Sequence, residues 1–492
     1  MLKKQIIKIL AISILNTLTI HANSIFTLDE AIHIACKNSF EAQLARFSFM
    51  GSYWTYRSFR AQLKPSVNLS GDLLNFNHSK VGVQSSDNGK INYVNNNSMA
   101  NSLTLSVDQQ IVPTGGTLSL QSYLYRLDQF DYKLSNYNSQ PLRLSYTQPL
   151  HSYNSLKWEK KTAPKEFEKA KKVYLEAIES VAIQTTTLFF NAIISQSTYK
   201  QNMTKYKDLQ ELYEISEKRF TLGTITKSDL LQLKLSLLNA KVELTSAKTN
   251  TDEALFNLFS YLRVKDYEQV DLTPPSLIPD IVINANDALQ MALSNSSYQP
   301  SQDLTLLQAQ QNLAKTKSIN GIQMQLRGEA GLSKTADRFP EAFRNLQDNE
   351  IVGVTLTLPL FDWGLQKGKL KVAKSELQLA RTQIEQNQVS YIQNLKRQVI
   401  MFNFQGEQCK TSKTAQDISL ERYNITKKRF EAGTITVTDL NTAIQEQESA
   451  EYQYLSQLKD YWLDYYNLKK STLYDWIGRH KLDADFQTIG NM

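Results

Sequence analysis

One stretch of this sequence occurs twice, and that duplication constrains the fold more than any other feature. The first copy runs from Tyr213 to Leu230 and the second from Tyr423 to Leu440, at a constant offset of 210 residues without a gap. Eleven of the eighteen positions are identical. Each copy ends a long segment of helical periodicity, passes through a single glycine and enters a second such segment. The chain is therefore expected to contain the same large unit twice.

The glycines of the two copies, Gly223 and Gly433, indicate where a helix stops and the chain turns. Glycine readily adopts the left-handed conformation that closes many helices. A threonine shortly beyond each glycine can cap the next helix, and the candidates are Thr224, Thr226, Thr434 and Thr436. Each copy is thus expected to be the tip of a helical hairpin.

Long periodic segments flank both tips. From Asn154 to Phe220 and from Gly364 to Phe430 the pattern is helical over roughly 67 residues, or ~100 Å at 1.5 Å per residue. The return segment after Leu230 is shorter, and its apolar residues recur in steps of three and four. That heptad stripe, interrupted only by Thr251, is typical of coiled-coil packing between antiparallel helices. We therefore expect two long helical hairpins.

Six short segments instead alternate apolar and polar residues with a period of two. They lie within residues 66–73, 103–111, 118–124, 142–146, 323–332 and 352–360. One apolar and one polar face over about ten residues is what a transmembrane barrel strand requires, although a soluble antiparallel sandwich shows the same alternation. The position of these segments behind a signal peptide and between long helices favours the barrel.

The two halves are not equally long. A helical pattern from Leu28 to about Leu63 opens the first half and recurs in the second, where Ala288 matches Ala31 at an offset of 257. By Pro149, which matches Pro359, the offset has fallen to 210. The first half therefore carries 47 extra residues (257 minus 210), which we interpret as an added strand hairpin plus loop. The expected turn of that hairpin is residues 113–116, and the expected exterior loops are about 75–100, 128–140 and 333–350.

The first 22 residues have the pattern of a secretory signal peptide. Lys3, Lys4 and Lys8 precede the apolar run Ile9–Ile20, and Ala22 supplies a small residue for cleavage. An anchor helix is the weaker interpretation, because the run is shorter than the roughly 20 residues that span a bilayer. We find no later run apolar enough for a transmembrane helix, so such an exported chain is either soluble or crosses a membrane as strands.

Composition and motifs point away from catalysis. The net charge is +7, but charged residues are interspersed along helical faces, which indicates a solvated surface and no nucleic-acid partner. The five histidines have no metal-ligand spacing, and Cys36 and Cys409 are expected to be unpaired thiols. Lys227 and Ser228 follow Gly223 without the adjacent glycine of a phosphate-binding loop. We expect neither an enzyme nor a cofactor.

The duplication also predicts the layout of the chain. We expect a signal peptide (1–22), a first repeat (23–270) with strands at about 65–150 and a helical hairpin at 154–262, a Pro-rich linker (271–285), a second repeat (286–475) with strands at about 322–361 and a hairpin at 364–474, and a C-terminal tail (476–492). The expected fold class is mainly α with membrane β.

Three motifs carry a resemblance to a family. The LDEAI opening at Leu28, the paired R-F-x-x-G-T-x-T-x-x-D-L tips and the PLFDWG strand end at Pro359–Gly364 resemble the TolC-like outer membrane efflux proteins. The resemblance implies a homotrimer whose strands complete one β-barrel in the outer membrane and whose hairpins form an α-barrel tunnel in the periplasm. It implies passive export for a tripartite efflux pump or a type I secretion system. The implied partners are a periplasmic adaptor protein, an inner-membrane transporter of RND or ABC type, and outer-membrane lipid.

The resemblance also assigns roles to the two tips. The residues implied to contact the adaptor are Arg219, Phe220, Gly223, Thr224, Arg429, Phe430, Gly433 and Thr434. Asp229 and Asp439 match acidic positions near the family's periplasmic constriction, where one Asp439 per copy would form a ring that favours cations. The alternative interpretations are simple helix-end packing for the phenylalanines and ordinary helix-start stabilisation for the aspartates.

This sequence departs from the family pattern in two places. A tyrosine and an arginine that help to lock the closed end of the best-known member are replaced by Phe430 and Ile435, which predicts a constriction held more by packing than by ion pairs. Family members usually contribute four strands per copy, whereas this chain offers six. The trimer would then close at eighteen strands instead of twelve, or the added hairpin would extend outside the barrel wall. We favour the latter, because eighteen strands need a wider tunnel mouth.

A rival interpretation is a periplasmic adaptor or structural coiled-coil protein, since adaptors also carry long helical hairpins. Adaptors place one hairpin between soluble β domains and do not duplicate it, so the repeated strand pairs argue against this class. The cargo stays open between drugs, metals and proteins, because a polar lumen fits all three and selectivity normally resides in the pump.

Overall fold

The structure, a computed structural model, describes residues 25–84, 89–265, 270–275 and 278–491. The signal peptide expected at residues 1–22 lies outside the described residues. The chain divides into a hairpin unit (up to residue 51, 169–299 and from 387 onward) and a sheet unit (52–168 and 300–386). Both repeats contribute to each unit, so the duplication does not correspond to two separate domains.

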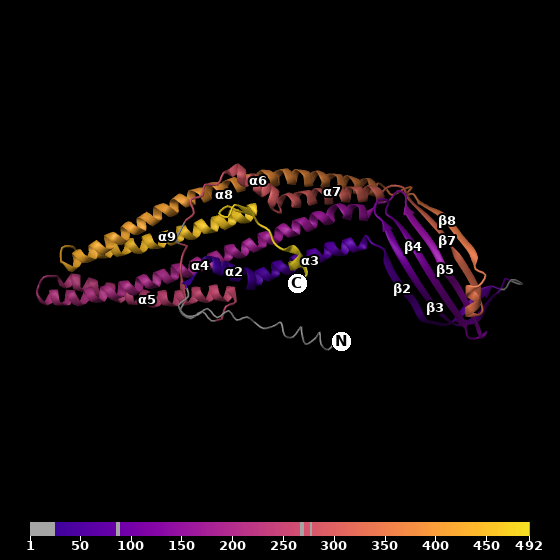
Figure 1. The fold of residues 1–492 in the computed structure, drawn as a ribbon, viewed down its shortest axis with the longest axis horizontal. Coiled ribbons are helices and arrows are strands. Elements are labelled where there is room, and N and C mark those ends of the chain that lie inside the picture. Colours follow the sequence, from indigo (N-terminus) through magenta and orange to yellow (C-terminus); the bar gives the residue numbers. More distant parts are fainter. Residues whose placement is uncertain (1–24, 85–88, 266–269, 276–277, 492) are drawn as a thin grey trace. The chain divides into compact units, whose positions relative to one another are not determined.

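The sheet unit contains, among the described residues, six antiparallel strands in the order β2-β3-β4-β5-β7-β8 (Figure 1). Their bounds are β2 (Ser66–Gln84), β3 (Ile91–Ile111), β4 (Gly116–Gln129), β5 (Leu134–Pro149), β7 (Gln323–Ala336) and β8 (Gln347–Thr357). A short 3-10 helix, η1 (Phe339–Phe343), lies between β7 and β8 in the chain. Because β5 of the first repeat pairs with β7 of the second, the two repeats share one continuous sheet. Each of the six predicted segments lies wholly or largely within one of these strands.

Two expectations about the strands are wrong. We expected the added hairpin to lie outside the wall formed by the other strands, but all six strands are neighbours in one sheet. We also expected residues 75–100 to be a loop, whereas β2 continues to Gln84 and β3 begins at Ile91. Strands likewise extend into the segments 128–140 and 333–350. Ladder hydrogen bonds join backbone groups, so pairing continues where the apolar alternation has ended.

The strand register sorts the side chains onto two chemically different faces. One row of directly paired residues is apolar on five strands, with Val67, Val107, Leu120, Leu144 and Ala330, and reaches Glu350 on β8. The adjacent row points to the other face and is polar apart from one glycine: Asn68, Ser106, Gln121, Arg143, Gly331 and Asn349. Neighbouring rows alternate in face because successive strand residues do. The sheet thus has the apolar and polar faces that a wall between lipid and water requires.

The turn between β3 and β4 lies at residues 112–115, one residue before the predicted 113–116, and side chains beyond β5 and at its end hold it in place. Gly115 has a φ of +75°, a conformation that favours glycine. The Asn154 amide donates to the Val112 carbonyl over 2.8 Å, and the Gln148 amide donates to the Thr114 carbonyl over 2.9 Å. This end of the added hairpin is therefore tied to the segment that leads into the first long helix.

Four long helices form two hairpins: α4 (Ser155–Thr221) with α5 (Lys227–Leu262), and α8 (Leu365–Glu431) with α9 (Val437–Thr472) (Figure 1). As predicted, α4 and α8 have 67 residues each, and the return helices have 36 each. Leu233, Ala240 and Leu258 of the heptad stripe are fully buried. Thr251, which interrupts the stripe, donates from its hydroxyl to the Ser195 carbonyl of α4 over 2.9 Å. The polar residue is therefore satisfied within the helix pair.

The helical segment expected from Leu28 to about Leu63 is two helices, α2 (Leu28–Asn38) and α3 (Phe40–Gln62). Ser39 separates them in an extended conformation, and its hydroxyl accepts a hydrogen bond from the Ala42 amide over 3.2 Å. The second repeat has the same break at Ser296, between α6 (Ala285–Asn295) and α7 (Tyr298–Ile319). A serine at the matching position of each repeat thus ends one helix and starts the next.

The core of the hairpin unit is rich in aromatic residues, and its largest fully buried side chains include Phe189, Phe190, Phe259, Phe402 and Tyr461. Helix α4 contains a stretch that by length and composition could cross a membrane, which corrects our expectation that no such run follows the signal peptide. Half of that stretch is buried inside the protein, as in the core helix of a soluble domain. Its apolar character is therefore explained by packing.

Short elements complete the unit: β1 (Ile25–Phe26) pairs in parallel with β6 (Asp271–Leu272), β9 (Tyr474–Asp475) pairs with β10 (His480–Lys481), and α10 (Phe486–Asn491) ends the described chain. Both cysteines are free thiols, as expected. Burial raises the pKa of Cys36 and of Cys409 to about 11, so neither thiol ionises readily.

Candidate functional site

The two hairpin tips have the same backbone. Gly223 and Gly433 adopt φ values of +70° and +77°, which confirms the predicted left-handed turns. The amide of Thr224 donates to the Arg219 carbonyl over 3.0 Å, and Thr434 donates to a carbonyl five residues back in the same way. The hydroxyls of both threonines donate to these same carbonyls, also over 3.0 Å. The eleven shared residues therefore fix one turn geometry twice.

The threonines that cap the following helices are Thr226 and Thr436. Thr224 and Thr434 do not cap because their hydroxyls already bond to the preceding helix. The capping hydroxyl accepts from the amide of Asp229 over 3.1 Å in the first tip, and from that of Asp439 over 3.2 Å in the second. The aspartate carboxylate accepts in return from the threonine hydroxyl over 2.7 Å and from its amide. This reciprocal pair is a capping box.

Electrostatics at the second tip hold Asp439 in its charged form. Hydrogen bonds from the hydroxyl and the amide of Thr436 lower the pKa of Asp439, and the positive charge of Arg429 lowers it further. Within one copy of the chain, Asp229 and Asp439 thus serve as helix-start residues. Their predicted role at a constriction stays a prediction, because it requires more than one copy.

The surroundings of the two tips differ although their backbones agree. Phe430 is 5% exposed, whereas Phe220, its counterpart in the first tip, is 39% exposed. Phe430 and the half-buried Ile435 belong to an apolar cluster between the hairpins. The buried members of that cluster are Leu209, Leu212, Leu233 and Ala240 of the first hairpin, and Phe430, Val437, Leu440 and Ile444 of the second. The second tip therefore packs on the first hairpin, while the first tip has no equivalent neighbour within the described chain.

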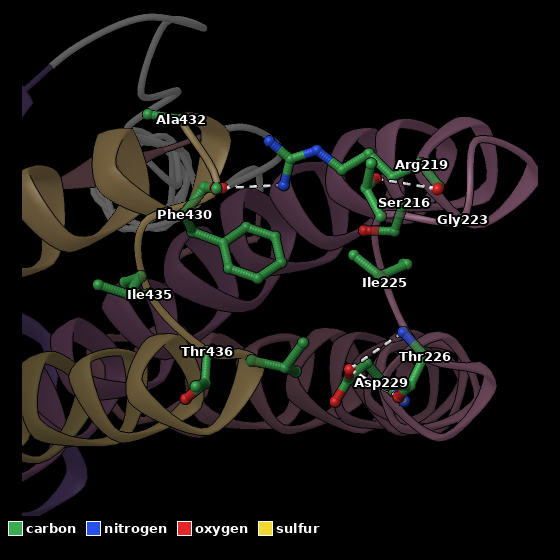
Figure 2. A pocket seen from close by; sticks show the side chains of 13 residues that line it. Ser216, Arg219, Gly223, Ile225, Thr226, Asp229, Phe430, Ala432, Ile435 and Thr436 are labelled. Atoms are coloured by element: carbon green, nitrogen blue, oxygen red, sulfur yellow. Dashed lines mark hydrogen bonds between the residues drawn. The ribbon is translucent and has the colours of Figure 1, made fainter.

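An arginine bridges the two tips. The Arg219 guanidinium donates to the carbonyl of Phe430 over 3.2 Å and to that of Glu431 over 2.6 Å. These carbonyls belong to the last turn of α8, which carries the negative end of the helix dipole, and that of Phe430 also accepts from the Gly433 amide over 2.9 Å. Figure 2 shows Arg219 extending from the first tip towards Phe430. A hollow of about 620 Å³ beside this contact is lined by residues of both tips.

The corresponding arginine of the second tip is not used in this way. Arg429 is exposed, and its guanidinium forms no hydrogen bond and no ion pair with the residues that the structure describes. The space around Gly223 and Gly433 shows the same difference between the two tips. A Cβ placed on Gly433 would lie 3.1 Å from the Arg219 guanidinium, whereas one placed on Gly223 would have nothing within 4 Å.

A second link between the hairpins was not predicted. Asp208 of α4 forms an ion pair with Lys427 of α8 over 2.6 Å and accepts a hydrogen bond from the Tyr423 hydroxyl. Burial and then this bond raise the pKa of Tyr423, which keeps the phenol protonated. The repeat could not reveal this contact, because position 418, the counterpart of Asp208, is an isoleucine.

Apolar side chains are exposed on the return helix of the first hairpin. Four of them follow one side of α5, and each is more than half exposed: Leu231, Leu235, Leu238 and Val242. Leu222 at the first tip is 77% exposed. A contiguous exposed apolar surface of this kind is typical of a protein interface.

Within the described ranges no group of three or more His, Cys, Asp or Glu side chains could hold a metal ion. Arg219 bonds to a helix end, and Asp229 and Asp439 bond to the threonines that cap the next helices. The candidate site is therefore the pair of tips as a contact and closure surface, with Arg219, Phe220, Gly223, Thr224, Asp229 and their counterparts as its elements.

Comparison with known proteins gives a match to one family model and likenesses to solved structures. Residues 289–472 match the family model described as outer membrane efflux protein. No curated protein sequence matches the chain.

Solved structures match over most of the chain. The Campylobacter jejuni CmeC outer membrane channel matches with a TM-score of 0.65 at 15% identity, covering 94% of this chain and 88% of that one. The outer membrane protein VceC from Vibrio cholerae gives 0.62 at 15%, with coverage of 92% and 96%. The open state of the Neisseria gonorrhoeae MtrE outer membrane channel gives 0.60 at 16%, with coverage of 93% and 91%. These likenesses confirm the expected fold class of long helical hairpins with an antiparallel sheet.

Proposed function

The chain belongs to the TolC-like outer membrane efflux protein family, whose members are channels and not enzymes, and from this premise we propose that three copies form one passive export duct. The strands of the sheet unit build the barrel in the outer membrane, and the helices extend into the periplasm. The duct passes the substrates of an efflux pump or of a type I secretion system without changing them.

The unpaired edges of the sheet carry this proposal. Within the described chain, β2 pairs only with β3 and β8 only with β7, so each outer edge presents free backbone N–H and C=O groups. Every residue of β2 is exposed. An unpaired backbone polar group in lipid costs several kcal/mol, and membranes are therefore crossed by closed barrels. Edge pairing between copies closes the sheet, and three copies supply eighteen strands.

Eighteen strands make a wide duct. Barrels of 16 to 18 strands leave a water-filled channel, whereas eight-stranded barrels are filled by their own side chains. The polar face of the sheet, with Asn68, Gln121 and Arg143, suits such a lumen, and the apolar face suits lipid. The continuity of all six strands supports this larger barrel over the twelve-stranded alternative.

The tips are the proposed docking surface for a periplasmic adaptor. Arg219, Phe220, Gly223 and Thr224 of the first tip and their counterparts Arg429, Phe430, Gly433 and Thr434 match the family's tip motif. The exposure of Phe220 and of Leu222 supports this assignment, since exposed apolar residues at a helix end suit a partner. The buried Phe430 has the second role considered for it, which is helix-end packing. An inner-membrane transporter of RND or ABC type completes the assembly.

We further propose that the tips close the resting duct. Asp229 and Asp439 line the constriction, and the carboxylates select for cations. The closure depends on packing of Phe430 and Ile435 in the cluster between the hairpins. Conductance of Asp439→Ala in planar bilayers tests the aspartate: reduced cation selectivity supports the role, and unchanged conductance and selectivity remove Asp439 from the gate.

The decisive experiment is fractionation of cells that express the full chain. We expect the protein in the outer-membrane fraction, as a trimer in detergent that resists mild heating. Reconstituted trimers should conduct ions through planar bilayers. Recovery only from the soluble periplasmic fraction would instead support the adaptor or structural coiled-coil alternative and overturn the duct.

A further inference from the structure

The contact between the two tips has a direction. Arg219 of the first tip donates to the last-turn carbonyls of the second, and both tips have the same turn geometry. One chain is therefore left with the Arg429 guanidinium as a donor and with an acceptor site at the last turn of α4, where the Phe220 carbonyl accepts from the Gly223 amide and the Thr221 carbonyl follows it. No side chain of the described residues donates to either of these two carbonyls.

In a head-to-tail contact between identical copies, a donor of one copy pairs with an acceptor at a different place on the next copy. Arg429 and the last turn of α4 are such a donor and acceptor. We propose that Arg429 of each copy bonds to the carbonyls of Phe220 and Thr221 in the neighbouring copy, as Arg219 bonds to those of Phe430 and Glu431 within the chain. The inference rests on the proposed trimer and names the contacts that close its tips. Six arginine contacts then alternate around the ring, three within copies and three between them.

Two observations identify the first tip as the receiving surface. Phe220 is exposed where Phe430 is buried, and Gly223 is open where Gly433 lies under a guanidinium. The carbonyls of α4 carry the same negative helix end as those of α8, so a guanidinium is favoured there equally. The guanidinium contact that the second tip receives from Arg219 is thus one that the first tip lacks in a single copy.

The proposal assigns different tasks to two arginines of identical local sequence. Arg219 fastens the two hairpins of one copy, and it can stay bound when copies separate at the tips. Arg429 spans the boundary between copies, and its contact must break when the tunnel end opens. The inter-copy contacts are thus the ones on which an opening partner acts.

Cross-linking distinguishes the two contacts. In a Cys36→Ser, Cys409→Ser background, the pair Arg429→Cys and Thr221→Cys replaces the two ends of the proposed contact. The matched control is Arg219→Cys with Glu431→Cys, which replaces the two ends of the contact within the chain. Purified protein is treated with a short bifunctional thiol reagent, boiled and run on a denaturing gel, and the linked peptides are identified by mass spectrometry.

The control pair should give a linked product of single-chain mass, and the test pair should give covalent dimers and trimers. Arg429→Cys alone should give no dimers, which excludes links between like positions. A test pair that stays unlinked, or links only within one chain, while the control pair reacts overturns the inference. The wild-type mass in detergent is measured first by ultracentrifugation. A wild type that is not a trimer overturns the proposed duct itself, which is a different failure.

Discussion

The two hairpin tips share eleven of eighteen residues and one turn geometry, yet one is buried against a neighbour and the other is exposed. Local sequence explains the similarity: the same glycine and the same capping threonine fix the same backbone. The difference comes from residues outside the repeat, and from the fact that a single copy has a neighbour on one side only. When two identical motifs of one chain differ in their contacts, the contact that one motif lacks indicates where a second copy binds.

The largest expected difference between the tips concerns their phenylalanines. Phe430→Ala opens a cavity in the cluster between the hairpins and should destabilise the protein by about 3 kcal/mol. Phe220→Ala removes a partly exposed ring and should cost about 1 kcal/mol. Denaturant midpoints of the helical circular dichroism signal measure both. Equal losses would mean that the assembly buries the two rings alike.

The next largest effect concerns the ion pair between Asp208 and Lys427, which has no counterpart at the matching positions of the other repeat. Asp208→Asn leaves the half-buried Lys427 without its anion and weakens the Tyr423 hydrogen bond, so we expect a loss of about 2 kcal/mol. The loosened hairpins should also raise single-channel conductance. The control is Glu217→Gln, at the exposed counterpart of Lys427, which should stay within about 0.5 kcal/mol of wild type. An Asp208→Asn variant as stable as this control would remove the ion pair from the closure.

The sequence predicted what is local and repeated. Helix lengths, the left-handed glycines and the polar–apolar alternation of the strands follow from periodicity and from residue type. The choice of Thr226 over Thr224 as the cap did not follow, because it depends on which hydroxyl bonds back to the preceding helix. The contacts of Asp208 were missed because they join residues 215 and 219 positions apart.

The extent of the strands was underestimated for a related reason. Apolar alternation marks the part of a strand that faces lipid, but ladder hydrogen bonds do not depend on side chains. Thus β2 and β3 continue through polar residues such as Asn95 and Asn96. The predicted position of the added hairpin outside the barrel wall was wrong because the prediction rested on family strand counts and not on strand pairing. Edge availability, which decides pairing, is a property of the folded sheet.

A third test concerns the glycines. Gly223→Ala and Gly433→Ala each force a left-handed alanine and should cost about 1 kcal/mol. In a single copy only the second would also meet a guanidinium, at 3.1 Å. If Arg429 contacts the neighbouring copy, the two substitutions should destabilise the trimer equally, and Arg429→Ala should selectively reduce the cost at Gly223. A larger loss at Gly433 than at Gly223 in intact trimers would contradict that contact.

The smallest expected effect is on the pH dependence of stability and concerns the return helices far from the tips. There α9 carries Asp464 at the position of Ala254 in α5. Burial, and then the charge of Asp460, raise the pKa of Asp464 to about 6. Because the folded-state pKa exceeds the unfolded value, the folded protein binds this proton more tightly. The contribution of Asp464 to the free energy of unfolding is therefore greatest below the unfolded pKa of about 4. It falls as the pH rises towards 6 and is constant above that.

Asp464→Ala installs the residue of the other repeat and removes this dependence. We expect a gain of about 1 kcal/mol at pH 7.5 and a smaller gain at pH 5, measured by denaturant midpoints at both values. The matched control is Asp460→Asn, which installs the counterpart Asn250 of the first repeat, lowers the pKa of Asp464 and should shift the same pH dependence downward. A gain independent of pH would show that Asp464 is solvated in the assembled tunnel. It would then line the lumen, where α5 presents an alanine, and the two return helices would differ in the face that they show to the cargo.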